Sequence, residues 1–544
     1  MIARFDAIII GAGISGLYQL YKLRELGLKV LVYEAGDGVG GTWYWNRYPG
    51  ARFDSESYSY QYSFSQALLD EWNWSEHFAA QPETLRYVNF VADKLDLRRD
   101  IRFSTFIEGA DYDEQRKQWT VRTQDGDLAE TKFLITAIGP LSVPTMPNIE
   151  GAASFAGESF HTGRWPHQDV NFEGKRVAVI GTGATGVQVI QEVAKTAATL
   201  TVFQRNPNWC APLHNSPISD EDQPAIHASY DEVFEICRNS HGAFMYDADP
   251  RKALDLSQQE RDAFYEKLYT EPGFGIWLGN FRDILINEEA NATLSKFVAS
   301  KVRERVDNPA TAEKLIPINH GFGTRRVPME TGYYEVYNQD NVRLIDLRDT
   351  PIHRITPAGI DINRQDGEAI SNELLEFDVI IYATGFDAVV GGFNRLDIRG
   401  AGGIALKDKW ATGPRTHLGM QINRFPNLFT LVGPHNAASF CNIPRCIEQN
   451  VEWVSDLIAY MGENGLETVE ATPEAEDAWT EHVYQSAQGL LLAKVDSWFN
   501  GININLPGRQ TRNFLLYAGG APAYREKCDA VAMKGYEGMT FDRP

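Results

Sequence analysis

Two glycine-rich turns carry the residue types that hold the pyrophosphate of a dinucleotide. The first, Gly11-Ala12-Gly13-Ile14-Ser15-Gly16, follows a short apolar run and precedes residues with helical spacing. The second, Gly181-Thr182-Gly183-Ala184-Thr185-Gly186, stands in the same setting. Glycines allow a tight turn and a close backbone approach, and the start of the helix then offers N–H groups to the phosphates. Because the motif recurs in the same context, the sequence predicts two dinucleotide sites.

The residue at the end of the following strand distinguishes the two sites. In the first unit it is Glu34, whose carboxylate can accept hydrogen bonds from the ribose hydroxyls of FAD or NAD. The corresponding residues of the second unit are Gln204 and Arg205. No carboxylate there repels a 2′-phosphate, and a guanidinium can pair with it. The alternative is an ordinary surface arginine after a strand, but the preceding motif favours NADP.

A dense group of aromatic residues, glycines and arginines fills residues 40–54. Flat apolar side chains can cover a flavin ring, and this explains the composition better than core packing does. The stretch ends at Asp54, which could act in a site or serve only as a turn or cap residue. His161, in the segment before the second glycine turn, would on its own be interpreted as a structural histidine.

Strands and helices must position these groups. We expect strands at residues 7–10 and 177–180 before the glycine turns, and late strands that end at Gly139 and Gly385. Helical signals replace strand signals between about residues 216 and 317. The sequence therefore predicts an α/β protein with two Rossmann-like dinucleotide-binding domains and a helical insertion in the second.

The order of these signals also predicts the domain boundaries. Because the second unit closes at Gly385, the tail, with a strand-like run at residues 428–432, should return to the first domain. The predicted pieces are a first dinucleotide-binding domain (1–144 and 386–544), an NADP-binding domain (145–213 and 328–385) and a helical subdomain (214–327).

Composition bounds the possible functions. The chain has 544 residues, enough for about three to four domains. Its net charge of −22 makes nucleic acid and anionic membrane surfaces poor partners. The five cysteines are scattered without a CxxC motif, which argues against a disulfide framework or a metal site and fits a reducing compartment. With no secretion signal or membrane span evident, we expect a cytoplasmic protein.

The segment before the second glycine turn carries a resemblance to a known family. It contains Phe155, Gly157, His161, Trp165 and Pro166 in the pattern FxGxxxHxxxWP. Placed between two GxGxxG turns, this resembles the fingerprint of type I Baeyer-Villiger monooxygenases, and the resemblance covers essentially the whole chain. Related flavin monooxygenases that oxidise amines and sulfides usually lack the Trp-Pro ending. The resemblance implies FAD in the first unit, NADPH in the second, and a linker at His161 that couples their motion.

The resemblance also implies roles for single residues. Arg326 matches the family's active-site arginine, Asp54 the acid beside it, and Arg325 a basic position, commonly lysine, that contacts the 2′-phosphate. Trp498 matches a tryptophan on a mobile loop near residues 496–508, which is longer here than usual. The cofactor contacts predicted from the motifs and the resemblance are Gly11, Gly13, Ser15, Gly16, Glu34, Thr42, Trp43, Tyr44, Trp45, Arg52, Asp54, Tyr60, Ile107, Thr182, Gly183, Ala184, Thr185, Gly186, Gln188, Arg205, Asn206, Arg325, Arg326, Ile443 and Trp498.

The chemistry that the resemblance implies is the oxygenation of a ketone. NADPH reduces FAD, the reduced flavin adds O2 to give a C4a-peroxide, and this attacks the carbonyl to give an ester or lactone. Ser439, Phe440 and Cys441 are expected to line the ketone pocket. The partners expected are a small ketone and O2, with no obligate protein partner. Two alternatives stay open: a flavin monooxygenase acting on sulfur or nitrogen, and a nonenzymatic nucleotide-binding sensor.

Overall fold

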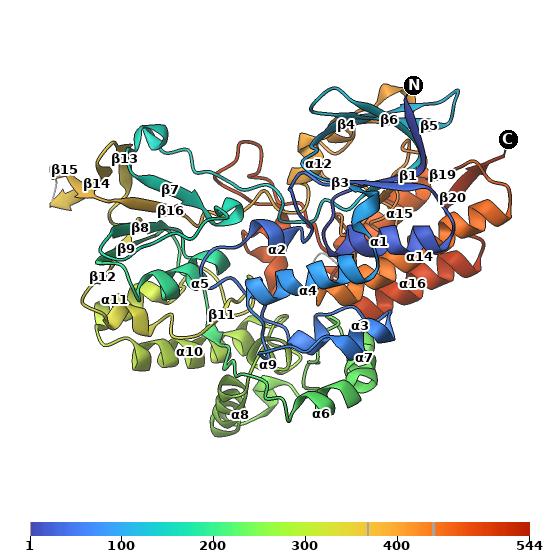
Figure 1. Ribbon diagram of the computed structural model, residues 1–544. Coiled ribbons are helices and arrows are strands. Elements are labelled where there is room, and N and C mark those ends of the chain that lie inside the picture. The colour runs from blue at the N-terminus through green and yellow to red at the C-terminus, as the bar shows by residue number, and fades with distance from the viewer. Residues whose placement is uncertain (1, 367–368, 438–440, 544) are drawn as a thin grey trace.

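Two α/β lobes stand side by side above a group of helices in the computed structural model (Figure 1). The structure describes residues 2–366, 369–437 and 441–543. Both chain ends lie in the right-hand lobe of Figure 1, which contains the first glycine turn. The left-hand lobe contains the second turn, so the two nucleotide motifs belong to different lobes.

The first sheet carries the first glycine turn and is completed by the tail of the chain. Its strands are β1 (Ala3–Ile10), β2 (Val30–Tyr33), β3 (Ile101–Arg102), β4 (Ile107–Asp113), β5 (Gln118–Thr123), β6 (Leu128–Thr136), β17 (Asp397–Arg399) and β18 (Leu428–Thr430). The order is β17-β4-β5-β6-β1-β2-β3, and β18 also pairs with β6. Strands β4, β5 and β6 form an antiparallel meander, whereas β1 pairs in parallel with β2 and β6.

Alternating side chains of β1 bury both faces of this sheet. Ile9 packs with the helices, whereas Ile8 and Ile10 face the opposite side and pack with Trp119 and Leu428. A strand that is buried on both faces reads as a continuous apolar run, and residues 7–10 have this character. The covering helices are α1 (Ile14–Glu25), α4 (Gln81–Lys94), α14 (Ile443–Glu463), α15 (Pro473–Ser486) and α16 (Ala521–Met533).

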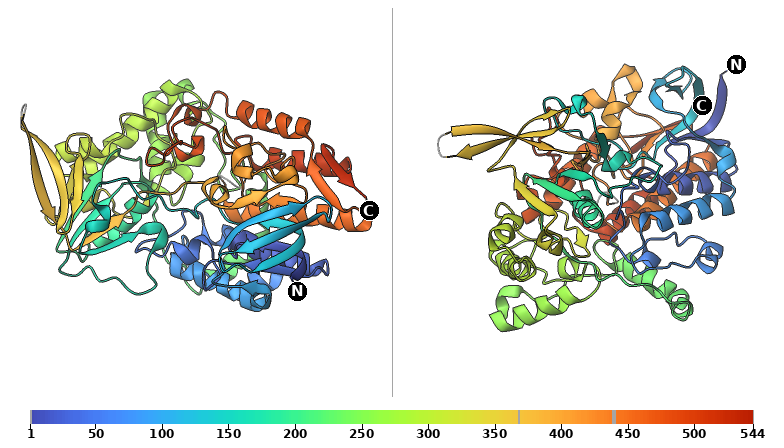
Figure 2. Two further views of the ribbon diagram at one scale, coloured as in Figure 1. Left: turned by 90° about the horizontal axis from the view of Figure 1, so that it is seen from above. Right: turned by 60° about the vertical axis from the view of Figure 1, so that its left-hand side comes forward.

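The second sheet is parallel throughout and carries the second glycine turn. Its strands are β7 (Glu158–His161), β8 (Arg176–Ile180), β9 (Thr199–Gln204), β12 (Val342–Asp346) and β16 (Val379–Tyr382), in the order β12-β9-β8-β16-β7. Helix α5 (Ala184–Val193) follows the turn directly. An antiparallel arm, not anticipated from the sequence, projects from this lobe (Figure 2) and consists of β13 (Ile352–Thr356), β14 (Gly359–Asp366) and β15 (Ala369–Glu376).

Helices fill the stretch between β9 and β12 and lie below both lobes in Figure 1. They are α6 (Gln223–Ala228), α7 (Tyr230–Asn239), α8 (Gln258–Thr270), α9 (Gly275–Leu278), α10 (Glu288–Arg305) and α11 (Pro309–Leu315). A capping box between Ser257 and Glu260 starts α8. Leu294 and Val298 of α10 share one buried cluster with Val187 of α5, so the helices pack against the second lobe. The residue numbers of the domain boundaries stay predictions.

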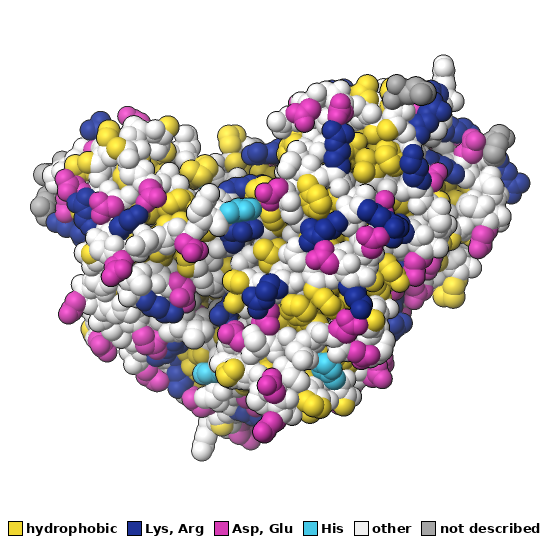
Figure 3. Space-filling model, viewed as in Figure 1, with side chains coloured by type: hydrophobic (Ala, Val, Ile, Leu, Met, Phe, Trp, Pro, Cys, Tyr) yellow, Lys and Arg dark blue, Asp and Glu magenta, His cyan; other side chains and the backbone are white. Residues whose placement is uncertain are grey.

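The surface carries both signs of charge. On the face shown in Figure 3, lysine and arginine side chains are interspersed with aspartate and glutamate, and the outline is hollowed between the two lobes. Within residues 2–366, 369–437 and 441–543, none of the helices combines the length and apolar character that a membrane span requires.

Candidate functional site

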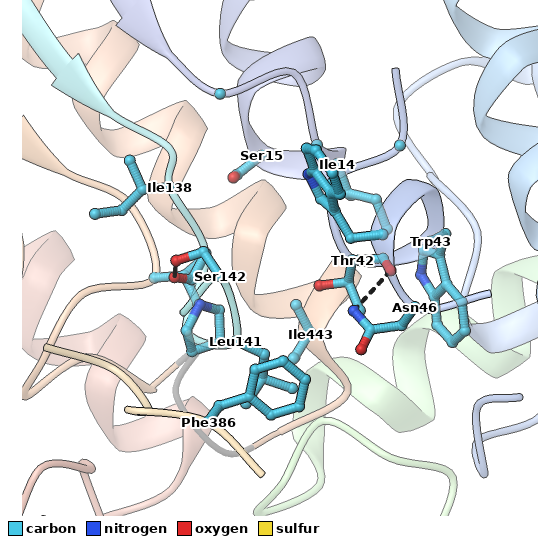
Figure 4. A pocket seen from close by; sticks show the side chains of 18 of the residues that line it. Ile14, Ser15, Thr42, Trp43, Asn46, Ile138, Leu141, Ser142, Phe386 and Ile443 are labelled. Carbon is cyan, nitrogen blue, oxygen red and sulfur yellow. Dashed lines mark hydrogen bonds between the residues drawn. The ribbon is translucent and has the colours of Figure 1, made fainter. Parts of the chain in front are cut away.

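A cavity of about 470 Å³ lies where the two lobes and the helices meet. Figure 4 shows part of its wall, with Thr42, Trp43 and Asn46 on one side and Ile138 and Ser142 on another. The predicted site residues that line it are Gly11, Gly13, Ser15, Glu34, Thr42, Trp43, Trp45, Arg52, Asp54, Tyr60, Ile107, Ala184, Thr185, Gln188, Arg326, Cys441, Ile443 and Trp498. The cavity therefore brings together segments from both ends of the chain.

The first glycine turn is tightly enclosed by its neighbours. Gly11 has a φ of 107°, and a Cβ there would lie 2.5 Å from the Ala137 carbonyl oxygen of the late strand. A Cβ on Gly16 would overlap the Gly11 carbonyl oxygen. Gly13 is covered from above, since its Cβ would lie 3.4 Å from the Cα of Gly41. Only glycine satisfies the backbone geometry and the space at Gly11.

Glu34 is buried at the end of β2 and held by backbone donors. Its Oε2 accepts from the Ala12 N–H and its Oε1 from the Gly36 N–H, both at 2.7 Å. Burial raises the pKa of the Glu34 carboxyl, and these N–H groups oppose the shift. Each oxygen can accept a second hydrogen bond, and the side chain faces the cavity, so the group fits recognition of a ribose diol.

The second glycine turn has the same backbone but a different environment. Gly181 has a φ of 110°, close to that of Gly11, and a Cβ there would meet the Ala383 carbonyl oxygen. By contrast, a Cβ on Gly183 would meet no atom of the described residues within 4 Å. Ala184 and Thr185 begin α5 and line the cavity, while Gly186 packs on the carbonyl of Gly181. The second turn is therefore open where the first is covered.

The polar residues after β9 divide into a buried and an exposed group. Gln204 is fully buried, and its Nε2 donates to the Lys314 carbonyl at 2.7 Å, so this side chain points away from the nucleotide turn. Arg205 is exposed, and its Nη1 donates to Asn505 Oδ1 at 3.3 Å. The Asn206 carbonyl accepts from Thr182 Oγ1 at 3.1 Å. Only Arg205 of this pair is available to a 2′-phosphate.

Arg325 lies near Arg205. Among the described residues, its buried Nε has no hydrogen-bond partner. Burial lowers the pKa of the Arg325 guanidinium; the charge of Asp496 opposes this and that of Arg205 adds to it. The Asp496 carboxylate is itself paired with Arg512, and Arg205 donates to the neutral Asn505. Two neighbouring guanidinium groups with little direct neutralisation fit a phosphate.

Asp54 and Arg326 form an ion pair across 272 residues of sequence. Arg326 Nη1 donates to Asp54 Oδ2 at 2.8 Å and to the Val327 carbonyl at 2.8 Å. The Asp54 side chain is 1% exposed and that of Arg326 is 30% exposed. Asp54 Oδ2 also accepts from the Met329 N–H at 3.3 Å. Among the described residues no partner bonds Nε or Nη2 of Arg326, so one edge of the guanidinium is available to the cavity.

Aromatic residues from the helical insertion close the cavity opposite the first lobe. Phe244, Phe274 and Trp277 line it, and the Arg326 Cζ lies 5.9 Å from the centre of the Phe274 ring. These three residues were missed from the sequence, and Tyr48 was interpreted only as part of the aromatic stretch 40–54. An isolated aromatic residue in a helical segment reads as core, and no local signal places it at a site formed by distant segments.

Among the described residues, the predicted contacts that do not line the cavity are Gly16, Tyr44, Thr182, Gly183, Gly186, Arg205, Asn206 and Arg325. Tyr44 packs beneath Gly36, and its hydroxyl donates to Asp37 Oδ1 at 2.6 Å, so its ring does not face the cavity. Ser439 and Phe440 lie outside the described residues. Cys441 is described, is 8% exposed and lines the cavity.

His161 lies where the two linkers between the lobes meet, outside the cavity. The Thr145 N–H donates to the Gly385 carbonyl at 2.9 Å, which joins the outgoing and returning linkers. His161 Nδ1 accepts from the Gly163 N–H at 2.9 Å, so the ring caps the short turn that follows. Burial lowers the pKa of His161 to about 4, with the Thr145 and Gly385 backbone opposing the shift. The ring is therefore neutral near pH 7.

The other fingerprint residues pack around this junction and around the second sheet. Trp165 is buried against Phe160 and Phe172. A Cβ on Gly157 would lie 2.5 Å from the Asp378 carbonyl oxygen, which explains a small residue there. Phe155 packs at the buried cluster of the antiparallel arm, and Pro166 follows Trp165 at the end of the linker. The fingerprint residues therefore lie at and around the connection between the two lobes.

The segment 496–508 reaches both lobes. Trp498 lines the cavity, and Asn503 Nδ2 donates to Thr145 Oγ1 at 3.2 Å and to the Phe386 carbonyl at 3.1 Å. Together with the contact between Asn505 and Arg205, these bonds lay the segment over the linker junction and the arginine pair. The extra length predicted for residues 501–508 would fall in the part that makes these contacts.

Comparison with known proteins gives consistent matches over the whole chain. The family model described as pyridine nucleotide-disulphide oxidoreductase matches residues 8–242. The 2-oxo-Δ3-4,5,5-trimethylcyclopentenylacetyl-CoA monooxygenase of Pseudomonas putida is 50% identical, covering 98% of each chain. A Baeyer-Villiger monooxygenase of Pseudooceanicola batsensis is 42% identical, covering 99% of this chain and 97% of the relative. The crystal structure of OTEMO with FAD and NADP has a TM-score of 0.94 at 50% identity, covering 99% of each chain.

Proposed function

This chain belongs to the Baeyer-Villiger monooxygenases, and we propose that Arg326 and Asp54 are its catalytic residues. It is a flavoprotein monooxygenase that uses FAD and NADPH to insert one oxygen atom beside a ketone carbonyl and form an ester or lactone. The assignment of these two residues rests on one observation: the buried Asp54 carboxylate holds Arg326 at the cavity. The ketone and O2 are the small molecules that we expect it to bind.

The residues at the first turn fit FAD. Gly11 and Gly13 form a cradle that a side chain would fill, and α1 begins directly after it. Glu34 would accept hydrogen bonds from the ribose hydroxyls. Thr42 and Trp43, at the start of α2 (Thr42–Trp45), would lie along the flavin half of the cofactor.

The residues at the second turn fit NADPH. The open turn at Gly183 leaves space for a pyrophosphate at the start of α5. The unpartnered Arg325 Nε supports a 2′-phosphate beside Arg205, because buried guanidinium groups are costly without a partner. Asn505 would then lie at the edge of the same phosphate.

Arg326 would act by its permanent charge. When bound and reduced by NADPH, FAD supplies the activation of O2, the chemistry that side chains cannot perform. Arg326 does not give up its proton in proteins, so it can stabilise negative charge that develops on oxygen during attack on the ketone. Asp54 orients Nη1, which leaves Nε and Nη2 for the reacting groups. The aromatic wall of Phe244, Phe274 and Trp277 would exclude water from this charge.

The test is a panel of ketones with NADPH and FAD-loaded protein, read by product mass. We expect a product one oxygen atom heavier than the ketone for the wild type. Arg326→Ala should keep bound FAD but lower ester formation at least about 100-fold, because a preorganised charge is lost. Arg326→Lys should recover part of the rate. A near-normal rate in Arg326→Ala would refute the role of this residue.

The same experiment separates the alternatives. A nonenzymatic nucleotide sensor would bind NADPH but would not consume it faster when a ketone is added. A sulfur or nitrogen oxygenase would consume NADPH with sulfide or amine substrates and yield no ester from any ketone. Ester in the product therefore separates the ketone oxygenase from both alternatives, and NADPH consumption with sulfides or amines separates the alternatives from each other.

A further inference from the structure

Tyr48 and Gln188 form a buried contact between the two lobes. The Tyr48 hydroxyl donates to Gln188 Oε1 at 2.7 Å, and the two residues are 7% and 8% exposed. Gln188 lies on α5, one turn after Ala184 at its start, and Tyr48 lies on the loop that leads to Asp54. Both residues line the cavity. The contact therefore joins the helix of the second nucleotide turn to the segment that carries the catalytic acid.

Further contacts fix the loop directly on α5. Gln188 Nε2 donates to the Arg52 carbonyl at 3.1 Å, so each end of this amide has a partner on the same loop. The Ala51 N–H donates to the Tyr48 carbonyl at 3.1 Å and closes a turn. At Gly50, where φ is 81°, a Cβ would lie 2.6 Å from the Gln188 carbonyl oxygen. The backbones are thus in contact, and a shift of α5 must move residues 48–52.

The loop also lies within electrostatic reach of the catalytic pair. The pKa of the Tyr48 hydroxyl is raised, first by burial and then by the negative charge of Asp54, while the charge of Arg326 opposes the shift. Asp54 follows the loop along the chain and holds Arg326 at 2.8 Å. A continuous path of direct contacts and short backbone therefore leads from Gln188 through Tyr48 and Asp54 to Arg326.

We propose that Tyr48 is a positioning residue that couples occupation of the NADP site to the placement of Arg326. The inference rests on the proposed function of Asp54 and Arg326. A nucleotide bound at the start of α5 restrains that helix, and the bond between Gln188 and Tyr48 transmits the restraint to the loop before Asp54. Gln188 acts here as a strut between lobes, because both ends of its amide are bonded to the loop.

The test uses FAD-loaded protein and three variants: Tyr48→Phe, Gln188→Met and the double variant. NADP⁺ affinity is measured from the change in flavin absorbance on titration. The second measurement is the fraction of the consumed NADPH that yields ester rather than hydrogen peroxide. Since one buried hydrogen bond contributes about 1 kcal/mol, we expect Tyr48→Phe to weaken NADP⁺ binding about fivefold and to raise the peroxide share. In a protein that already carries Gln188→Met, adding Tyr48→Phe should weaken NADP⁺ binding by less than about a further twofold.

Tyr265→Phe is a matched control. Tyr265 is fully buried in the helical insertion, outside the cavity, and its hydroxyl lies 2.8 Å from Thr293 Oγ1. This variant removes one buried tyrosine hydroxyl with one neutral partner, as Tyr48→Phe does. We expect a similar fall in melting temperature but unchanged NADP⁺ affinity and product ratio.

Several outcomes would overturn the proposal. It is wrong if the effects of Tyr48→Phe and Gln188→Met multiply in the double variant, or if Tyr48→Phe behaves like Tyr265→Phe. If Tyr48→Phe does not accumulate as folded protein, Gln188→Met alone must reproduce the loss of affinity and the rise in peroxide. A wild-type protein that forms no ester would instead refute the proposed function, so the two failures are distinguishable.

Discussion

The two glycine turns have nearly the same backbone but opposite surroundings. Gly11 and Gly181 have φ values of 107° and 110°, and each is pressed against the carbonyl of a late strand. The central glycines differ, because Gly13 is covered by Gly41, whereas in the described part of the chain no atom lies within 4 Å of a Cβ on Gly183. The first turn is therefore enclosed by its own lobe, whereas the second turn is open at its central glycine.

The charged groups near the two turns differ in a similar way, because one is held by hydrogen bonds and the other is not. Both oxygens of Glu34 are held by backbone donors, so the first site is organised before a ligand arrives. Arg325 has a buried Nε with no partner among the described residues, and we propose that the nucleotide completes this second site. The same fold unit can thus serve a permanently bound nucleotide or an exchanging one, depending on what covers the turn. FAD and NADPH match these two roles.

The largest expected effect comes from placing the same side chain on the two turns. Gly11→Ala adds a Cβ at a positive φ and 2.5 Å from a carbonyl oxygen, so we expect a loss of at least about 3 kcal/mol in unfolding free energy and no bound FAD. Gly183→Ala should change the unfolding free energy by less than about 0.5 kcal/mol. Thermal unfolding and the ratio of flavin to protein absorbance measure both. Equal behaviour of the two variants would show that the surroundings of the two turns do not differ in their tolerance of a side chain.

A change of intermediate size, in nucleotide affinity, should come from Arg325. Arg325→Ala removes a charge-assisted partner of the 2′-phosphate, so we expect the affinity for NADPH to fall about 10- to 100-fold and that for NADH less than twofold. Arg348→Ala is the control, because Arg348 lies in the same lobe but pairs with Asp346. Titrations with both nucleotides measure the change. Equal losses for NADPH and NADH would contradict the role of Arg325.

The smallest effect should come from the connection between the two units. The pKa of His161 is lowered to about 4 by burial, below the ordinary value of 6.5. The unfolded chain therefore binds the proton first, and stability is lost as pH falls from about 6.5 towards 4. His161→Asn, which keeps an acceptor for the Gly163 N–H, should remove about 1 kcal/mol of this loss at pH 6.

Unfolding by urea at pH 7.5 and pH 6 measures this difference. His353→Asn, at an exposed position on β13, is the control for the substitution itself. A pH dependence that is the same in His161→Asn and the wild type would show that the linker histidine does not contribute to it.

The parts of the site that were predictable from sequence depend on local geometry. A glycine with positive φ between a strand and a helix leaves a short signature, so Gly11 and Gly181 could be located without a structure. Glu34 follows from its place after the second strand. The pairing of Asp54 with Arg326 came only from the family resemblance, because no local rule joins residues that are so far apart in the chain.

The parts that were not predictable depend on which way a side chain turns. Gln204 occupies the position expected at the nucleotide, but its amide satisfies the buried Lys314 carbonyl. Tyr48 lay among the aromatic residues interpreted as a flavin cover, and only the structure shows its bond to Gln188. The antiparallel arm had a usable signal in the alternation of Ile360 and Ile362, which pack into a buried cluster.

The hydrogen bond between Thr145 and Gly385 has a mechanical consequence. The chain leaves the first lobe near Thr145 and returns near Gly385, so both crossings are pinned at one point. Other contacts, such as that between Tyr48 and Gln188, also hold the lobes together. Where those contacts loosen, one lobe can rotate about the Thr145–Gly385 junction, and the parts far from the junction move furthest. Asn503, bonded to Thr145 and to Phe386 beside Gly385, sits near the pivot and would move little while the cavity mouth widens.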